Sequence, residues 1–191
     1  MSSFLSGRTI MVTGATSGIG YETARLLAES GATVLLHGRT PEEARAAVQR
    51  LLATADVDAE LLRPCAADFS RLDEVERLAN RVITGHPYLD ALVNNAAVAA
   101  PEQHTVTADG NELAFQVNFL AHYLLTHLLE PALTPAEGAA HVVRLCDPAV
   151  EIVNGAYYDR GSRREPAAGA TEERTVKRLN RLADQLVGHC A

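Results

Sequence analysis

A glycine-rich segment near the beginning of the chain is the clearest candidate for chemistry. Residues 13–20 read Thr-Gly-Ala-Thr-Ser-Gly-Ile-Gly and follow a short apolar run. Glycines allow a tight turn and a close approach of backbone to a pyrophosphate, and a following helix directs free N–H groups at the same phosphates. A glycine-rich turn without a ligand is the alternative, but the flanking strand and helix patterns favour a dinucleotide site. Its predicted residues are Gly14, Thr16, Ser17, Gly18, Ile19 and Gly20.

The charge beyond this segment indicates which dinucleotide is bound. An acid that binds the ribose is expected about 20 residues after the glycines, but Arg39 stands there. Because a guanidinium can pair with a 2′-phosphate, NADP is predicted in preference to NAD. Arg8, just before the first strand, could assist. The alternative is that Arg39 is a solvated loop arginine.

Alternating strand and helix patterns are expected to position these residues. Apolar runs predict strands at 8–14, 33–37, 60–66 and 89–94, and helical spacing predicts helices at 18–30, 41–54, 71–84 and 110–130. Such alternation implies a parallel sheet with helices on both faces. Pro64 restricts the third strand to an edge. Beyond Leu133, residues 136–146 fit a helix or, at 141–145, a strand; 155–159 fit a brief strand and 171–187 a final helix.

Composition limits the partners and the surroundings. The chain has 191 residues, a net charge of −7 and a pI of about 5.5, which predicts one domain and argues against nucleic acid or an anionic membrane as partner. No apolar run approaches the roughly 20 residues of a membrane span. Three scattered cysteines indicate reduced thiols in a cytoplasmic protein and no metal site.

Four segments together resemble the short-chain dehydrogenase/reductase family. The spacing of Gly14, Gly18 and Gly20 is the first, and Asp68 matches the aspartate that contacts adenine. Residues 94–97 match Asn-Asn-Ala-Gly, with Ala97 in place of glycine, and 117–126 are similar to the retinol-dehydrogenase-like branch. The resemblance implies a Rossmann-type doubly wound parallel sheet of order 3-2-1-4 and oxidoreduction of a small carbonyl or alcohol substrate. It also implies cofactor contacts from Asp68, Asn95 and Ala96, and a proton relay through Asn118.

The catalytic pair of that family, Tyr-x-x-x-Lys, is missing. None of the five tyrosines has a lysine four residues later, because the only lysine is Lys177. One alignment makes 1–133 the Rossmann core and 134–191 a remnant C-terminal segment, with about a third of a typical member absent between them. A second alignment makes 141–147 the fifth strand, with Asp147 at the serine position and Tyr158 near the tyrosine. Tyr158 is then the candidate proton donor. A non-redox enzyme on the same scaffold and a catalytically silent binding protein remain alternatives.

A sheet shortened on its C-terminal side would expose one edge of the fourth strand. Either a replacement strand from 141–145 or 155–159 covers it, or a second subunit does. We expect a homodimer that buries an apolar helix face formed by Leu113, Val117, Leu120 and Leu124.

Overall fold

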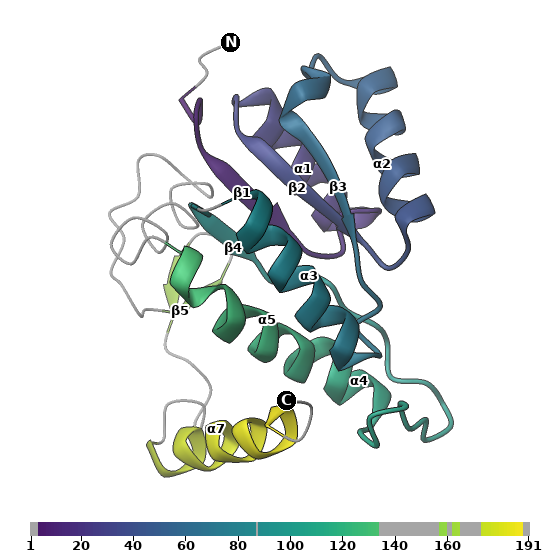
Figure 1. Ribbon diagram of the computed structural model, residues 1–191, viewed down its shortest axis with the longest axis vertical. Helices are drawn as coiled ribbons and strands as arrows, with labels where there is room; N and C mark the ends of the chain where they lie inside the picture. The colour runs from purple at the N-terminus through teal and green to yellow at the C-terminus, as the bar shows by residue number, and fades with distance from the viewer. Residues whose placement is uncertain (1–3, 87, 134–156, 160–161, 165–172, 189–191) are drawn as a thin grey trace.

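The central sheet has four parallel strands in the order β3-β2-β1-β4. The computed structural model describes residues 4–86, 88–133, 157–159, 162–164 and 173–188. Figure 1 shows the sheet formed by β1 (Thr9–Val12), β2 (Thr33–Gly38), β3 (Leu62–Ala66) and β4 (Ala91–Val93). Val12 lies level with Leu36 on one side and Val93 on the other. The predicted strand order is confirmed, and Pro64 lies in the edge strand, where a missing N–H is tolerated.

Helices cover both faces of the sheet, as the alternating pattern predicts (Figure 1). Helices α1 (Gly18–Glu29) and α2 (Pro41–Thr54) pack on one face, around buried Ile10, Val12 and Leu36. Helices α3 (Leu72–Gly85) and α5 (Ala121–Leu129) pack on the other, around Met11 and Leu35. Neighbouring strand residues thus face opposite layers. The result is a three-layer sandwich with two apolar cores.

The long helix expected at 110–130 begins later and is not uniform. Glu112 accepts hydrogen bonds from the N–H groups of Ala114 and Phe115 at 3.0 and 2.7 Å, which starts α4 (Leu113–Phe115). A π-helical turn, Gln116–Leu120, joins α4 to α5, and a short 3₁₀ turn, Glu130–Ala132, follows α5. π-Helical turns are frequent at functional sites, and this one contains the predicted site residue Asn118.

The helix face expected to form a dimer is buried within the subunit. Val117, Leu120 and Leu124 are 7%, 0% and 4% exposed. They belong to the same apolar cluster as α3 side chains such as Leu78 and Val82. The prediction that this face is uncovered is wrong, because α3 already packs against it. Leu113, the fourth residue of the predicted face, is partly buried and packs against the same cluster.

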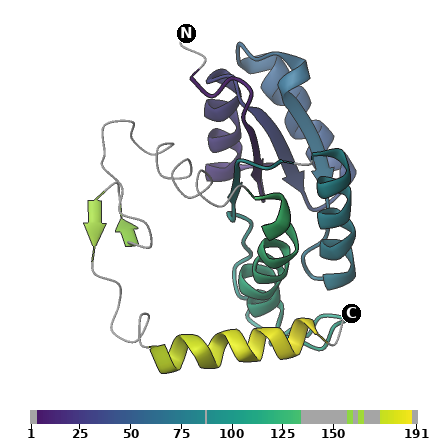
Figure 2. The ribbon, with the colours of Figure 1, turned by 60° about the vertical axis from the view of Figure 1, so that its left-hand side comes forward.

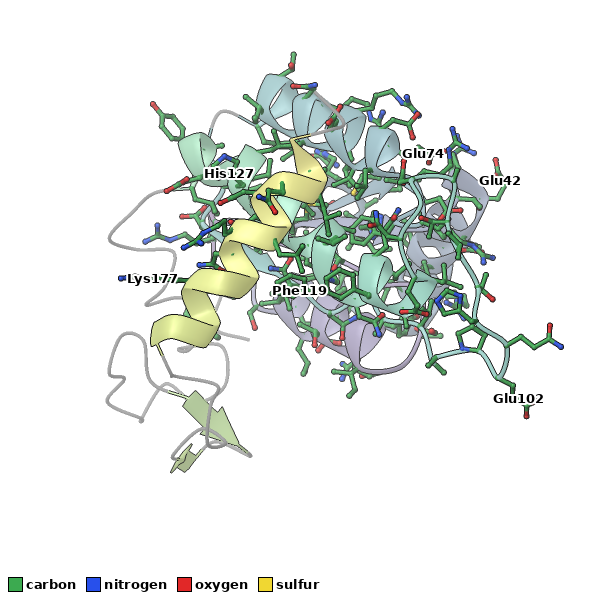
Figure 3. The ribbon with its side chains drawn as sticks, turned by 90° about the horizontal axis from the view of Figure 1, so that it is seen from below. Glu42, Glu74, Glu102, Phe119, His127 and Lys177 are labelled. Carbon is green, nitrogen blue, oxygen red and sulfur yellow. The ribbon has the colours of Figure 1, made fainter. Side chains whose placement is uncertain are left out.

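A C-terminal helix, α7 (Glu173–Val187), packs across α5 (Figure 2). The Tyr123 hydroxyl donates to Asp184 Oδ1 at 2.8 Å, and Ala183 is fully buried. Figure 3, viewed from below, shows α7 crossing the molecule between the labelled Phe119 and His127. This helix covers part of the outer surface of α5.

The predicted replacement strand at 155–159 does not join the sheet. Strand β5 (Tyr157–Asp159) pairs antiparallel with β6 (Ser162–Arg164) in a separate two-stranded ribbon. That prediction is wrong, because a neighbouring segment pairs with the strand in place of β4. Residues 136–146, including the alternative strand 141–145, lie outside the described residues. Beside the start of β4, Leu133 forms an isolated parallel bridge with Leu89.

Candidate functional site

The glycine-rich loop joins β1 to α1 and has two residues with left-handed backbone. Gly14 has φ 62° and Gly18 has φ 54°, a region that side chains disfavour. A Cβ on Gly14 would lie 2.7 Å from Ala96 Cα, whereas a Cβ on Gly18 would meet nothing within 4 Å. Gly14 is thus required for packing against the end of β4. Gly18 leaves open space at the beginning of α1, where a phosphate can approach.

The N-terminus of α1 is available to an anion. Its N-cap residue, Ser17, makes no side-chain capping hydrogen bond, so that cap satisfies none of the N–H groups of the first turn. These groups and the helix dipole favour a negatively charged ligand. Beside them the Ile19 side chain is 82% exposed, although apolar side chains of this size are usually covered. Ser17, Gly18 and Ile19 therefore form an open cradle at the start of α1, whereas Gly20 packs against Asn95 and Gly14.

Thr13 links this loop to the end of β4. Its Oγ1 accepts hydrogen bonds from the N–H groups of Asn95 and Ala96 at 2.8 and 2.9 Å. The Asn95 amide donates to the carbonyls of Thr13 and Gly14 at 2.8 and 3.1 Å. The structure thus brings Asn95 and Ala96 to the loop, as the resemblance implies, and the Asn95 side chain fixes the loop's shape.

A buried histidine that the sequence analysis did not select also supports the loop. His37, near the end of β2, is 2% exposed. Its Nδ1 accepts from the Gly14 N–H at 3.2 Å, so Nε2 carries the proton and donates to the Ala67 carbonyl at 3.0 Å. Burial lowers its pKa to about 4. The sequence signal that could have identified His37 is its place as a histidine inside the apolar run at 33–38.

Arg39 and Asp68 follow the ends of β2 and β3. The Arg39 side chain is 67% exposed and pairs with Glu43 at 2.8 Å. Asp68 Oδ1 accepts hydrogen bonds from the Ser70 N–H and hydroxyl at 2.9 and 2.8 Å, which shapes the turn before α3. Both therefore lie at the carboxyl edge of the sheet, where open α/β sheets bind ligands.

The prediction that Arg8 assists at this edge is wrong. Arg8 precedes β1, so it lies at the opposite end of the strand from Gly14. Its guanidinium binds the Asp90 carboxylate at 2.8 Å.

A hollow of about 670 Å³ lies between the end of β4 and α5. Its lining includes Asn95, Ala96 and Asn118. The Asn118 amide accepts from the Val98 N–H at 2.8 Å and donates to the Val98 carbonyl at 3.0 Å. The structure thus brings three predicted residues into one hollow, and the Asn118 side chain orients the segment after β4.

Two other ionisable groups of the hollow have pKa values that are shifted toward the neutral form. His122 lies with Nε2 3.1 Å from Thr13 Oγ1, and burial lowers its pKa. The hydrogen bond to Asp184 raises the pKa of Tyr123. His122 therefore packs against Thr13 and, edge to face, against the Phe69 ring.

Tyr158 lies in β5, which does not pair with the four-stranded sheet. Its side chain lies outside what the structure describes, so its predicted part in catalysis stays a prediction.

Within the described ranges, no three His, Cys, Asp or Glu side chains come together as a metal-binding group. None of the helices in this part of the chain combines the length and the apolar character of a membrane span.

Solved structures of similar fold confirm the architecture. A metagenomic short-chain oxidoreductase in complex with NADP matches with a TM-score of 0.57 and 36% identity, over 69% of this chain and 58% of that one. Pseudomonas aeruginosa RhlG, in an active-site complex with NADP, matches with a TM-score of 0.56 and 30% identity, over 68% and 49%.

Sequence comparisons agree. Mouse retinol dehydrogenase 13 is 40% identical over 129 residues, which are 65% of this chain and 36% of that protein. Human retinol dehydrogenase 11 is 38% identical over 125 residues, 65% of this chain and 38% of that protein. The matched part thus spans less than half of these relatives. A family model described as short chain dehydrogenase matches residues 8–152. The chain therefore belongs to the short-chain dehydrogenase/reductase family.

Proposed function

We propose that this chain binds NADP on the scaffold of the carbonyl–alcohol oxidoreductases of its family, and that it lacks their usual Tyr-x-x-x-Lys pair. The observation that carries the proposal is the cradle at the N-terminus of α1. Gly18 leaves open space there, Ser17 leaves the N–H groups uncapped, and Ile19 is exposed. A dinucleotide would bind its pyrophosphate to these N–H groups and cover the Ile19 side chain.

Arg39 supports NADP over NAD. Its carboxylate partner, Glu43, forms an exposed pair with it, which contributes at most about 1 kcal/mol and is readily exchanged for a phosphate. A carboxylate at position 39 would instead bind the 2′-hydroxyl of NAD. The two solved relatives described in complex with NADP support the same choice.

The reaction would take place in the hollow beside β4. Bound NADPH supplies a hydride to a carbonyl carbon, and Asn95, Ala96 and Asn118 would hold the walls of that space. The family match extends to residue 152, beyond Leu133. This extent favours the alignment that makes 141–147 the fifth strand and brings Tyr158 near the position of the catalytic tyrosine.

Replacing Arg39 by aspartate is expected to reverse the cofactor preference. Arg39→Asp removes a charge-assisted contact to the 2′-phosphate, worth about 1.5–3 kcal/mol, and offers an acceptor to the ribose of NADH. Isothermal titration should therefore show tighter binding of NADH than of NADPH. Arg45→Asp, on the helix that follows Arg39 and paired with Glu42, is the matched control. A variant that keeps the wild-type preference would contradict the role of Arg39.

Reduction of simple ketones and aldehydes is expected to be absent or very weak. General acid–base catalysis contributes about 10²–10⁴-fold, and the absent lysine removes cofactor positioning as well. NADPH oxidation with a panel of carbonyl compounds measures this. Tyr158→Phe should abolish residual turnover if 141–147 is the fifth strand and change little if 134–191 is a remnant. Robust turnover insensitive to Tyr157→Phe and Tyr158→Phe would contradict the account.

A further inference from the structure

Arg50, on α2, reaches the glycine-rich loop from a distant part of the chain. Its guanidinium donates a hydrogen bond to the Thr16 carbonyl. The same group lies over the Tyr21 ring, with Cζ 4.9 Å from the ring centroid. Tyr21 belongs to the first two turns of α1. A side chain that is otherwise solvent-exposed is thus fixed between the loop and the first helix.

Thr16 also contacts the end of β2, immediately before Arg39. A Cβ placed on Gly38 would lie 2.8 Å from the Thr16 methyl group, so the Thr16 side chain packs closely against the Gly38 backbone. Arg39 follows Gly38, and Arg50 binds the carbonyl of Thr16. The two arginines therefore belong to segments that both touch Thr16.

Arg39 and Arg50 differ in the groups that their guanidinium groups already bind. Arg39 already pairs with Glu43. Arg50 donates to a neutral carbonyl, and a guanidinium has five N–H donors, so several remain for an anion. Cation–π contact with Tyr21 holds the plane of the group without neutralising its charge. Arg50 is therefore the better prepared of the two to receive a phosphate.

We propose that Arg50 is a specificity-determining residue that supplies a second guanidinium to the 2′-phosphate of NADP. This inference rests on the proposed function, since it assigns a further contact to the same cofactor. Charge-assisted hydrogen bonds from two guanidinium groups bind a phosphate more strongly than one. Arg50 then binds the 2′-phosphate, and contacts with Thr16 and Tyr21 hold the Arg50 side chain in place.

The test is the affinity of the full chain for four probes: NADPH, NADH, adenosine 2′,5′-bisphosphate and 5′-AMP. Arg50→Met keeps the apolar stem and removes the charge, and Arg45→Met is the matched control on α2. We expect Arg50→Met to weaken the binding of NADPH and of the bisphosphate by roughly tenfold or more. The affinity for NADH and for 5′-AMP should change by less than about twofold. Arg50→Lys should restore part of the loss. Thermal unfolding checks that each variant is folded.

The outcomes separate this inference from the function on which it rests. Wild-type protein that does not prefer NADPH to NADH would overturn the proposed cofactor. Wild-type preference for NADPH that survives Arg50→Met would overturn the role of Arg50 alone. If Arg50→Met weakened the binding of all four probes equally, the role of Arg50 at the 2′-phosphate would also be overturned, because Arg50 would then only position the loop.

Discussion

Alanine at Gly14 is expected to lower the free energy of unfolding by roughly 2–5 kcal/mol. The backbone at Gly14 is left-handed, with φ 62°, which costs an L-residue about 1–2 kcal/mol. The added methyl group would lie 2.7 Å from Ala96 Cα, and overpacking of this kind costs about 1–3 kcal/mol more. Backbone cannot rotate away as a flexible side chain can. Urea unfolding of Gly14→Ala and wild-type protein measures the difference.

Gly18→Ala provides a contrasting variant in the same loop. Gly18 is also left-handed, with φ 54°, but a Cβ there meets nothing within 4 Å. We expect a stability loss of about 1–2 kcal/mol and at least about tenfold weaker dinucleotide binding, because the methyl group occupies the open space of the cradle. Gly85→Ala, in open space at the end of α3, is the control that should weaken neither stability nor binding. Unimpaired binding by Gly18→Ala would place the cofactor elsewhere.

Stability is expected to fall by about 3 kcal/mol between pH 7 and pH 4 through His37. Burial lowers the pKa of His37 from 6.5 to about 4, and one pKa unit corresponds to about 1.4 kcal/mol. The unfolded chain therefore binds more protons than the folded chain in this range. The contribution is fully present above pH 6.5 and is lost as the pH falls toward 4. Burial lowers the pKa of His122 as well, so His122 also contributes to the loss of stability as the pH falls.

His37→Asn tests this assignment. Asparagine keeps an acceptor for the Gly14 N–H but does not titrate. Urea unfolding at several pH values between 7.5 and 4.5 should give a flatter dependence of stability on pH for His37→Asn than for wild-type protein. His127→Asn, at a side chain that is 68% exposed, should leave the dependence unchanged. If the free energy of unfolding of His37→Asn depended on pH as steeply as that of wild-type protein, another group would cause the pH dependence.

The sequence was sufficient for the sheet and the loop because their signals are local. The apolar runs before Gly14 and Arg39 predicted β1 and β2, and helical spacing predicted α2 at 41–54, where the Thr40 hydroxyl accepts from the Glu43 N–H. The alternation of strands and helices predicted a parallel sheet, and its order β3-β2-β1-β4 was implied by the resemblance to the family. The predicted cofactor residues Gly14, Asn95 and Ala96 meet in the structure because parallel strands end at one edge.

Contacts between distant segments were not predictable in this way. His37 and Gly14 are 23 residues apart, and Arg50 and Thr16 are 34 apart, so neither pair produces a local pattern. The covering of Val117 and Leu124 by α3 likewise depends on how two helices pack. Sequence periodicity showed that this face is apolar, but it gave no information on what covers it. The dimer was expected because no covering element could be identified from the sequence.

Titration of wild-type protein with NADPH and with NADH under identical salt tests the central claim most directly. The account predicts that both bind through the pyrophosphate cradle and that NADPH binds at least about tenfold more tightly, because a charge-assisted contact to the 2′-phosphate is worth about 1.5–3 kcal/mol. The preference should shrink as salt concentration rises, since Arg39 is exposed. Equal affinity for the two dinucleotides, or tighter binding of NADH, would contradict the account.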